Sequence, residues 1–106
     1  MTLYLGDAKD ESLEKLVGMF AISPEARKGI DEILVVWRES ELYEDAIRVF
    51  FRGVDSLHYI VTATHCSCYE YEGAWKPELL SADYERIIFT SEFDRAVKQY
   101  LESLRS

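Results

Sequence analysis

The run AIRVFFRGVDSLHYIVTAT, residues 46–64, decides the fold class. Residues 46–52 and 59–64 are rich in β-branched and aromatic side chains, which favour strands. The segment Gly53-Val54-Asp55-Ser56 between them is typical of a turn, so the run predicts an antiparallel hairpin. The first half of the run keeps a second interpretation as a helix, because it also shows apolar residues at helical spacing. These are Ala46, Val49 and Phe50, together with Leu42, which precedes the run.

A third strand is predicted just before the hairpin. The segment Ile33-Leu34-Val35-Val36-Trp37 favours a strand by composition, although its apolar residues also continue a helical stripe. That helix would begin at Ser23-Pro24, an N-cap serine followed by proline in the first turn. We interpret the region as a helix that ends at about Asp31 and is followed by a strand. Three strands with short connections predict a meander, which needs helices to cover its apolar face.

Amphipathic helices are predicted on both sides of these strands. The first, capped by Asp10, places Leu13, Leu16, Val17 and Phe20 on one face. A short helix is expected from Ser81, and a last helix follows a cap at Thr90 or Ser91. The apolar face of that last helix comprises Phe93, Ala96, Val97, Tyr100, Leu101 and Leu104. The expected fold is one α+β domain over residues 1–106, a three-stranded antiparallel β-meander packed with two N-terminal helices and a C-terminal helix.

Composition and charge exclude several classes of protein. The chain has 106 residues, 48% of them hydrophobic, and a net charge of −8. A negative chain repels phosphates, which argues against direct nucleic-acid binding. No apolar run approaches the roughly 20 residues of a membrane span, and no signal peptide is recognisable at the start. We therefore expect a cytoplasmic protein without membrane contact, in which Cys66 and Cys68 are thiols.

The segment HCSCYEYEGAWKPE, residues 65–78, contains the side chains best suited to metal binding, catalysis or partner recognition. His65, Cys66 and Cys68 are the residues that would bind a metal, if any is bound. In a strand, however, His65 points away from both cysteines, and the chain has no second cysteine pair. We expect no metal and no cofactor. A cysteine enzyme is also not expected, because a nucleophile needs a base within hydrogen-bond reach and adjacent residues of a strand diverge.

Two further interpretations of this segment remain open. In the first it is structural, with small buried cysteines and with Tyr69 and Trp75 sealing the core. In the second it is a recognition surface, because aromatic side chains anchor interfaces and acids select a basic partner. The predicted partner-binding residues are Tyr69, Glu70, Tyr71, Glu72, Trp75 and Glu78. A second acidic cluster could extend that surface or form a solvated turn; it contains Glu39, Glu41, Glu44 and Asp45.

The same segment resembles a group of small uncharacterised proteins from tailed phages and prophages. The residues that carry the resemblance are His65-Cys66-Ser67-Cys68-Tyr69, Glu72-Gly73-Ala74-Trp75 and Lys76-Pro77-Glu78. It covers roughly residues 33–88. Position 74 departs from the group, where glutamine is frequent, and Glu70 and Tyr71 replace smaller residues. The resemblance implies a phage or prophage origin and supplies no catalytic residues.

Together these observations predict a non-enzymatic binding protein that docks on a host or phage protein with a basic surface. An inhibitor of a host defence nuclease would be one such protein, by analogy with small early phage proteins. Two alternatives stay open: a small-ligand or metal-binding domain that uses the loop His65–Cys68, and a cysteine-dependent enzyme. A homodimer is also compatible with the sequence.

Overall fold

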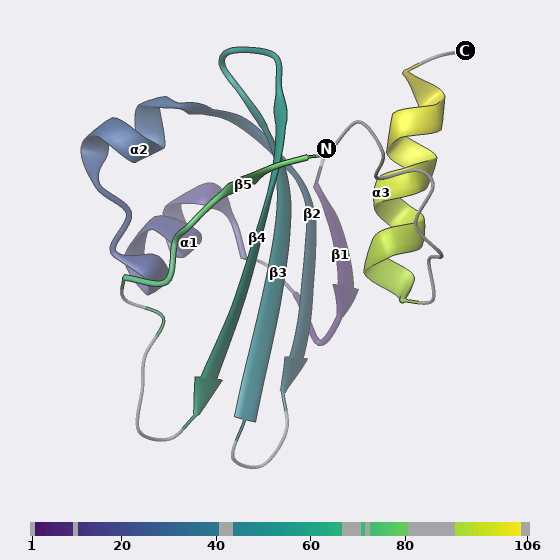
Figure 1. Cartoon of the computed structure of the whole chain (residues 1–106). Coiled ribbons are helices and arrows are strands. Elements are labelled where there is room, and N and C mark those ends of the chain that lie inside the picture. The colour runs from purple at the N-terminus through teal and green to yellow at the C-terminus, as the bar shows by residue number, and fades with distance from the viewer. Residues whose placement is uncertain are drawn as a thin grey trace.

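The computed structural model describes residues 2–9, 11–40, 44–66, 71, 73–80 and 91–104. In chain order the elements are β1 (Leu3–Gly6), α1 (Leu13–Phe20), α2 (Pro24–Lys28), β2 (Ile30–Ser40), β3 (Glu44–Gly53), β4 (His58–Cys66), β5 (Glu78–Leu79) and α3 (Glu92–Ser103). The strands form one sheet in the order β1-β2-β3-β4-β5. Helices α1 and α2 lie on one side of it and α3 on the other (Figure 1). Within these residues, no helix is long and apolar enough to cross a membrane.

The α+β class is confirmed, but the predicted three-stranded meander is wrong, because the sheet has five strands and is mixed. Strands β2, β3 and β4 are the predicted antiparallel neighbours. Strand β1 is added parallel to β2, and β5 is added antiparallel to β4. These two strands have only four and two residues, too few to show an alternating pattern in the sequence. The parallel pairing of β1 requires a crossover connection, which α1 and α2 provide.

A serine caps the N-terminus of each of the three described helices. The Ser12 hydroxyl accepts a hydrogen bond from the Lys15 backbone N–H, so Ser12 caps α1 rather than the predicted Asp10. Ser23 caps α2 as predicted, but this helix ends at Lys28, earlier than expected, because β2 already begins at Ile30. Ser91 caps α3, one of the two predicted residues. The short helix expected from Ser81 lies outside the described residues.

A bulge in β2 explains why its apolar run has an ambiguous pattern. Ile33 pairs with Phe51 and Val35 pairs with Phe50, which leaves Leu34 as an extra residue in the strand. Leu34 and Val35 therefore both face α3, whereas Ile33 faces α1. Both faces of the sheet are covered, so consecutive residues of the strand are buried.

Helix α3 is held by apolar anchors and by an arginine. Phe93 and Val97 are fully buried against the sheet, whereas Leu104 is 56% exposed, so the predicted apolar face ends one turn early. Arg52 of β3 donates a hydrogen bond to the Tyr100 hydroxyl at 3.2 Å. The Arg48 guanidinium lies 4.4 Å from the centre of the Phe93 ring, where it makes a cation–π contact.

His58 lies under α3 between two rings. Its imidazole stacks on Phe50, with ring centres 5.5 Å apart, and meets the edge of Tyr100 at the same distance. Burial, and secondarily the positive charge of Arg52, lowers the pKa of His58. A folded-state pKa below the unfolded value of about 6.5 means that this contribution to stability is present at pH 7 and is lost as the pH falls.

We therefore expect the free energy of unfolding to fall between pH 7 and pH 5, and the fall to be smaller in His58→Phe. Phenylalanine keeps the ring contacts and removes the titrating group. Urea melts of both proteins at the two pH values measure the difference. His65 is present in both proteins, so its contribution cancels, and the pKa values of Asp45 and Asp55 are lowered out of this range. Equal pH dependence in the two proteins would contradict the expectation.

Candidate functional site

An apolar pocket of about 300 Å³ lies at the end of the sheet where β3 turns into β4. We call it the aromatic pocket. Its lining residues come from α2, the two strands, their turn and the segment before β5. They are Ala26, Gly29, Phe51, Val54, Asp55, Tyr59, Trp75 and Pro77.

Stacked rings form the wall of the aromatic pocket. The Phe51 ring lies 5.4 Å from that of Tyr59 and 5.5 Å from that of Trp75, and both pairs are within 20° of parallel. Phe51 is only 3% exposed, whereas its two neighbours are partly exposed. Trp75 also meets the buried Phe20 edge to face. The wall is therefore a continuation of the core, held in place from behind and open in front.

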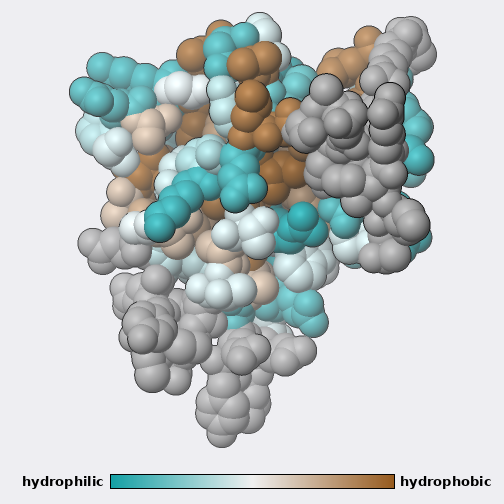
Figure 2. All heavy atoms as spheres, in the orientation of Figure 1, coloured by the Kyte–Doolittle hydropathy of each residue, from teal (hydrophilic) through white to brown (hydrophobic). Residues whose placement is uncertain are grey.

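Exposed apolar side chains gather around this pocket. Of the five most exposed large apolar residues in the described part, Val54, Leu57 and Leu79 belong to the β3–β4 turn and to β5. Val54 is 66% exposed and lines the pocket. Leu79 pairs with Tyr59, which places the two side chains on the same face of the sheet. Figure 2 shows the corresponding apolar surface at this end of the molecule.

Asp55 gives the aromatic pocket its only charge among the eight lining residues. Its carboxylate accepts hydrogen bonds from the Tyr59 hydroxyl at 2.6 Å and from the Leu57 backbone N–H at 3.0 Å. These bonds lower the pKa of Asp55, that from Tyr59 most, so the group is negative at neutral pH. The close approach requires glycine at position 53, because a Cβ there would lie 2.6 Å from the Asp55 carboxylate.

The predicted partner-binding residues do not all meet at this pocket. Trp75 lines it. Tyr71 is 5% exposed and packs on Phe20, so its ring has little surface to offer a partner. Glu78 is exposed, but it pairs with Ile60, which faces α3, whereas Trp75 packs on the opposite side of the sheet. Tyr69, Glu70, Glu72 and Cys68 lie outside the described residues, as do the side chains of His65 and Cys66.

Of the eight residues that line the pocket, the sequence analysis predicted only Trp75 as a site residue, and it missed the apolar and aromatic residues Phe51, Val54 and Tyr59. A signal for them existed. Phe51 and Tyr59 are paired in the hairpin, so they share one face of it. Val54 is an apolar residue within a turn, where polar residues are usual. What the sequence did not show is that Trp75, distant along the chain, stacks on Phe51 and lines the same pocket as Tyr59.

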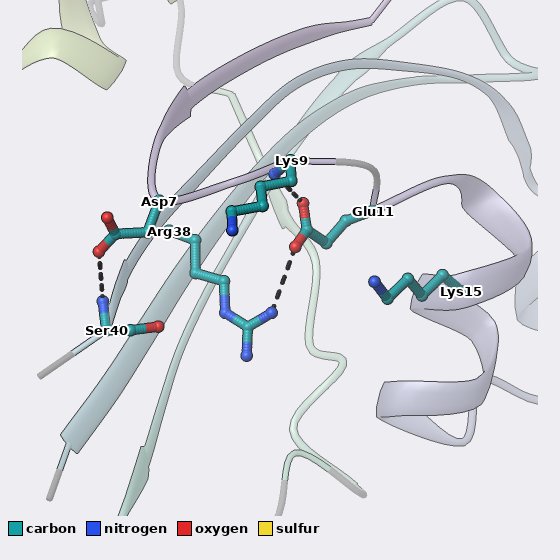
Figure 3. A pocket seen from close by; sticks show the side chains of 6 residues that line it. All are labelled: Asp7, Lys9, Glu11, Lys15, Arg38 and Ser40. Atoms are coloured by element: carbon teal, nitrogen blue, oxygen red, sulfur yellow. Dashed lines mark hydrogen bonds and ion pairs between the residues drawn. The ribbon is translucent and has the colours of Figure 1, made fainter. Parts of the chain in front are cut away.

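A second, polar pocket of about 470 Å³ lies at the other end of β2 (Figure 3). It is lined by Asp7, Lys9, Glu11, Lys15, Arg38 and Ser40. Arg38 donates to the Asp45 carboxylate through Nε and Nη2, at 3.1 and 2.6 Å, and to Glu11 through Nη1 at 3.2 Å. Glu11 is only 3% exposed and also accepts a hydrogen bond from the Lys9 backbone N–H. Arg38 is therefore the counterion of a buried carboxylate.

The same ion pair bears on the acidic cluster of residues 39–45. Burial alone would raise the pKa of Asp45, but the hydrogen bonds and charge of Arg38 outweigh it and lower the pKa. Asp45 is thus ionised and neutralised within the protein. Glu39 is exposed at the end of β2, while Glu41 and the side chain of Glu44 lie outside the described residues. At least one of the four acids is therefore unable to act as part of a free acidic surface.

Neither a metal site nor a similar protein indicates what the described part of the chain binds. Among the described residues, no three His, Cys, Asp or Glu side chains are grouped as a metal site. Comparisons of the chain with protein-family models, with curated proteins and with solved structures gave no significant match.

Proposed function

We propose that this chain is a non-enzymatic binding protein that docks on a basic partner protein through the aromatic pocket. The observation that carries the proposal is an open apolar pocket with a rigid aromatic wall, bordered by the 66% exposed Val54. Exposed apolar side chains that cluster on one surface are typical of interaction sites. The proposal moves the expected docking surface from residues 69–78 to a pocket in which Trp75 is the shared residue.

The pocket suits one large apolar side chain of the partner. Interface hot spots are buried, well-packed pockets surrounded by residues that exclude water. The rings of Tyr59 and Trp75 both stack on the buried Phe51, so the wall already has a fixed arrangement before a partner binds. Binding therefore does not pay the entropy cost of ordering these side chains. Leu57 and Leu79 would then form the apolar rim.

The charge of the chain supports a basic partner. Asp55 places one negative charge in the lining, and the chain as a whole carries −8. Such a field accelerates association with a positive surface and repels nucleic acid. Two copies of this chain would repel each other, which disfavours a homodimer through this surface. We propose that docking takes place in the cytoplasm, where Cys66 and Cys68 stay reduced.

Selection of random peptides displayed on phage particles against the immobilised full-length chain tests this function. We expect enrichment of sequences in which lysine or arginine flanks one large apolar residue. Val54→Arg should abolish their binding, because it removes apolar surface and adds a like charge at the pocket.

Leu104→Arg is the matched control, since Leu104 is a similarly exposed apolar residue that caps α3 and does not line the pocket. It makes the same change of charge and should leave binding within about twofold, because surface substitutions away from an interface cost little. Enriched peptides that bind Val54→Arg as well as the unchanged protein would refute the proposal. So would a selection that yields acidic sequences.

A further inference from the structure

We propose that the segment of the partner that enters the aromatic pocket is rich in proline and carries an arginine that pairs with Asp55. This inference rests on the proposed function, because it names the kind of segment that docks at the same pocket. A proline-rich segment adopts the polyproline II conformation, which has no hydrogen bonds within its own backbone. Domains that bind such segments use grooves lined with aromatic rings. The aromatic pocket presents rings of this kind, those of Phe51, Tyr59 and Trp75.

The position of the pocket in the sheet disfavours a partner that adds a strand. Phe51 belongs to β3, where it pairs with Ile33 on one side and with Tyr59 on the other. Tyr59 in turn pairs with Leu79 of β5. Both residues thus have a neighbouring strand on each side, so a partner reaches their side chains and not a free edge. A polyproline II segment binds in this way, because proline has no N–H to pair with a sheet.

Trp75 offers a hydrogen-bond donor that suits the backbone of such a segment. It is partly exposed, and no hydrogen bond within the described part of the chain uses its indole N–H. An indole N–H can only donate, so it needs an acceptor such as a backbone carbonyl. A proline-rich segment supplies carbonyl oxygens and has few backbone N–H groups that an apolar lining would leave unpaired. The aromatic wall therefore matches this backbone in both shape and hydrogen bonding.

Asp55 selects an arginine within the segment. Its Oδ2 accepts a hydrogen bond from the Tyr59 hydroxyl at 2.6 Å, and its Oδ1 accepts one from the Leu57 backbone N–H at 3.0 Å. These two bonds fix the orientation of the carboxylate, and each oxygen keeps a second lone pair for a partner. The planar fork of arginine meets both oxygens at once and stacks well on aromatic rings, whereas lysine is a point charge.

Titration of the full-length protein with a synthetic peptide, an arginine followed by alternating leucine and proline residues, tests the inference. We expect saturable binding that moves the Trp75 indole signal in a ¹H–¹⁵N spectrum. Replacing the prolines of the peptide with alanine should weaken binding about tenfold, because a flexible segment loses more conformational entropy when it binds.

Asp55→Asn tests the pairing with arginine, because it removes the charge and keeps a side chain that can bond Tyr59 and Leu57. It should weaken binding of the arginine peptide roughly three- to tenfold, as expected for a partly exposed charge-assisted contact. A peptide with alanine in place of arginine should bind Asp55→Asn and the unchanged protein equally well. This second result also shows that the variant keeps the pocket intact.

Glu78→Gln is the matched control, because it removes an exposed carboxylate on the α3 side of the sheet, opposite to Trp75. It should bind the arginine peptide as the unchanged protein does. The inference is overturned if the peptide without proline binds as tightly, or if Glu78→Gln weakens binding as much as Asp55→Asn. Display-selected peptides that lack proline but fail to bind Val54→Arg would also overturn it, and they would leave the proposed function intact. If neither selected nor synthetic peptides bind, the proposed function fails as well.

Discussion

Phe93→Ala is expected to cost about 3–5 kcal/mol of stability, the range for removing a fully buried aromatic ring. Phe93 is 0% exposed and is the first anchor of α3 on the sheet. Its loss leaves a cavity beneath the helix and removes the ring that contacts the Arg48 guanidinium. The total free energy of unfolding of a domain is of the order of 5–15 kcal/mol, so this loss is a large fraction of it. Urea melts at neutral pH measure the change.

Leu104→Ala, at the C-cap of the same helix, is the control. Leu104 is 56% exposed, so the cost should stay below about 0.5 kcal/mol. Leu101, which is partly buried, should give an intermediate value. Similar losses in Phe93→Ala and Leu104→Ala would mean that α3 does not pack on the sheet through the face described above.

Arg38→Met is expected to have the second largest effect, roughly 2–4 kcal/mol. Removing one partner of a buried ion pair leaves an uncompensated charge, which typically costs about 3–5 kcal/mol, and partial exposure of Arg38 reduces this. The charges left behind are those of Glu11, 3% exposed, and Asp45, 14% exposed. Denaturant melts at pH 7 measure the loss.

The pH dependence of this variant gives an independent check. In the unchanged protein Arg38 lowers the pKa of Asp45, so the stability from this pair is present at neutral pH and is lost as the pH falls. Without the cation, burial raises the pKa of Asp45, so in the variant this carboxylate is protonated, and its unpaired charge removed, at a higher pH than in the unchanged protein. The difference between the two proteins should therefore shrink from pH 7 towards pH 4. Arg27→Met, which breaks the exposed pair with Glu14, should cost below about 1 kcal/mol.

The central part of the fold could be predicted because its signals are local. Alternation indicates β4, and the spacing of Leu16 and Phe20 indicates α1. Composition favours strands for β2 and β3, although helical spacing left a helix open for both. β1 and β5 could not be predicted in this way. They are strands because they pair with β2 and β4, and their own sequences show no strand pattern. The bulge at Leu34 likewise depends on the register between β2 and β3.

The candidate site was only partly predictable. Trp75 was recognised as an aromatic residue in an unusual segment, and the same reasoning applied to Tyr71. An irregular segment has no repeating pattern that would indicate which side chains face the core. The sequence therefore does not show that Tyr71 is buried on Phe20 while Trp75 reaches the surface. Arg38 was not predicted as the partner of Glu11, because 27 positions separate the two residues.

The two indole N–H signals of the protein offer the most direct test of docking at the aromatic pocket. The chain has two tryptophans: Trp75 lines the pocket, and Trp37 packs on the α3 side of the sheet. Trp75→Phe assigns the signals in a ¹H–¹⁵N spectrum. On titration with a basic peptide from the display selection, the Trp75 signal should move saturably and the Trp37 signal should not. Saturable binding that moves the Trp37 signal, or leaves both unmoved, would contradict the account.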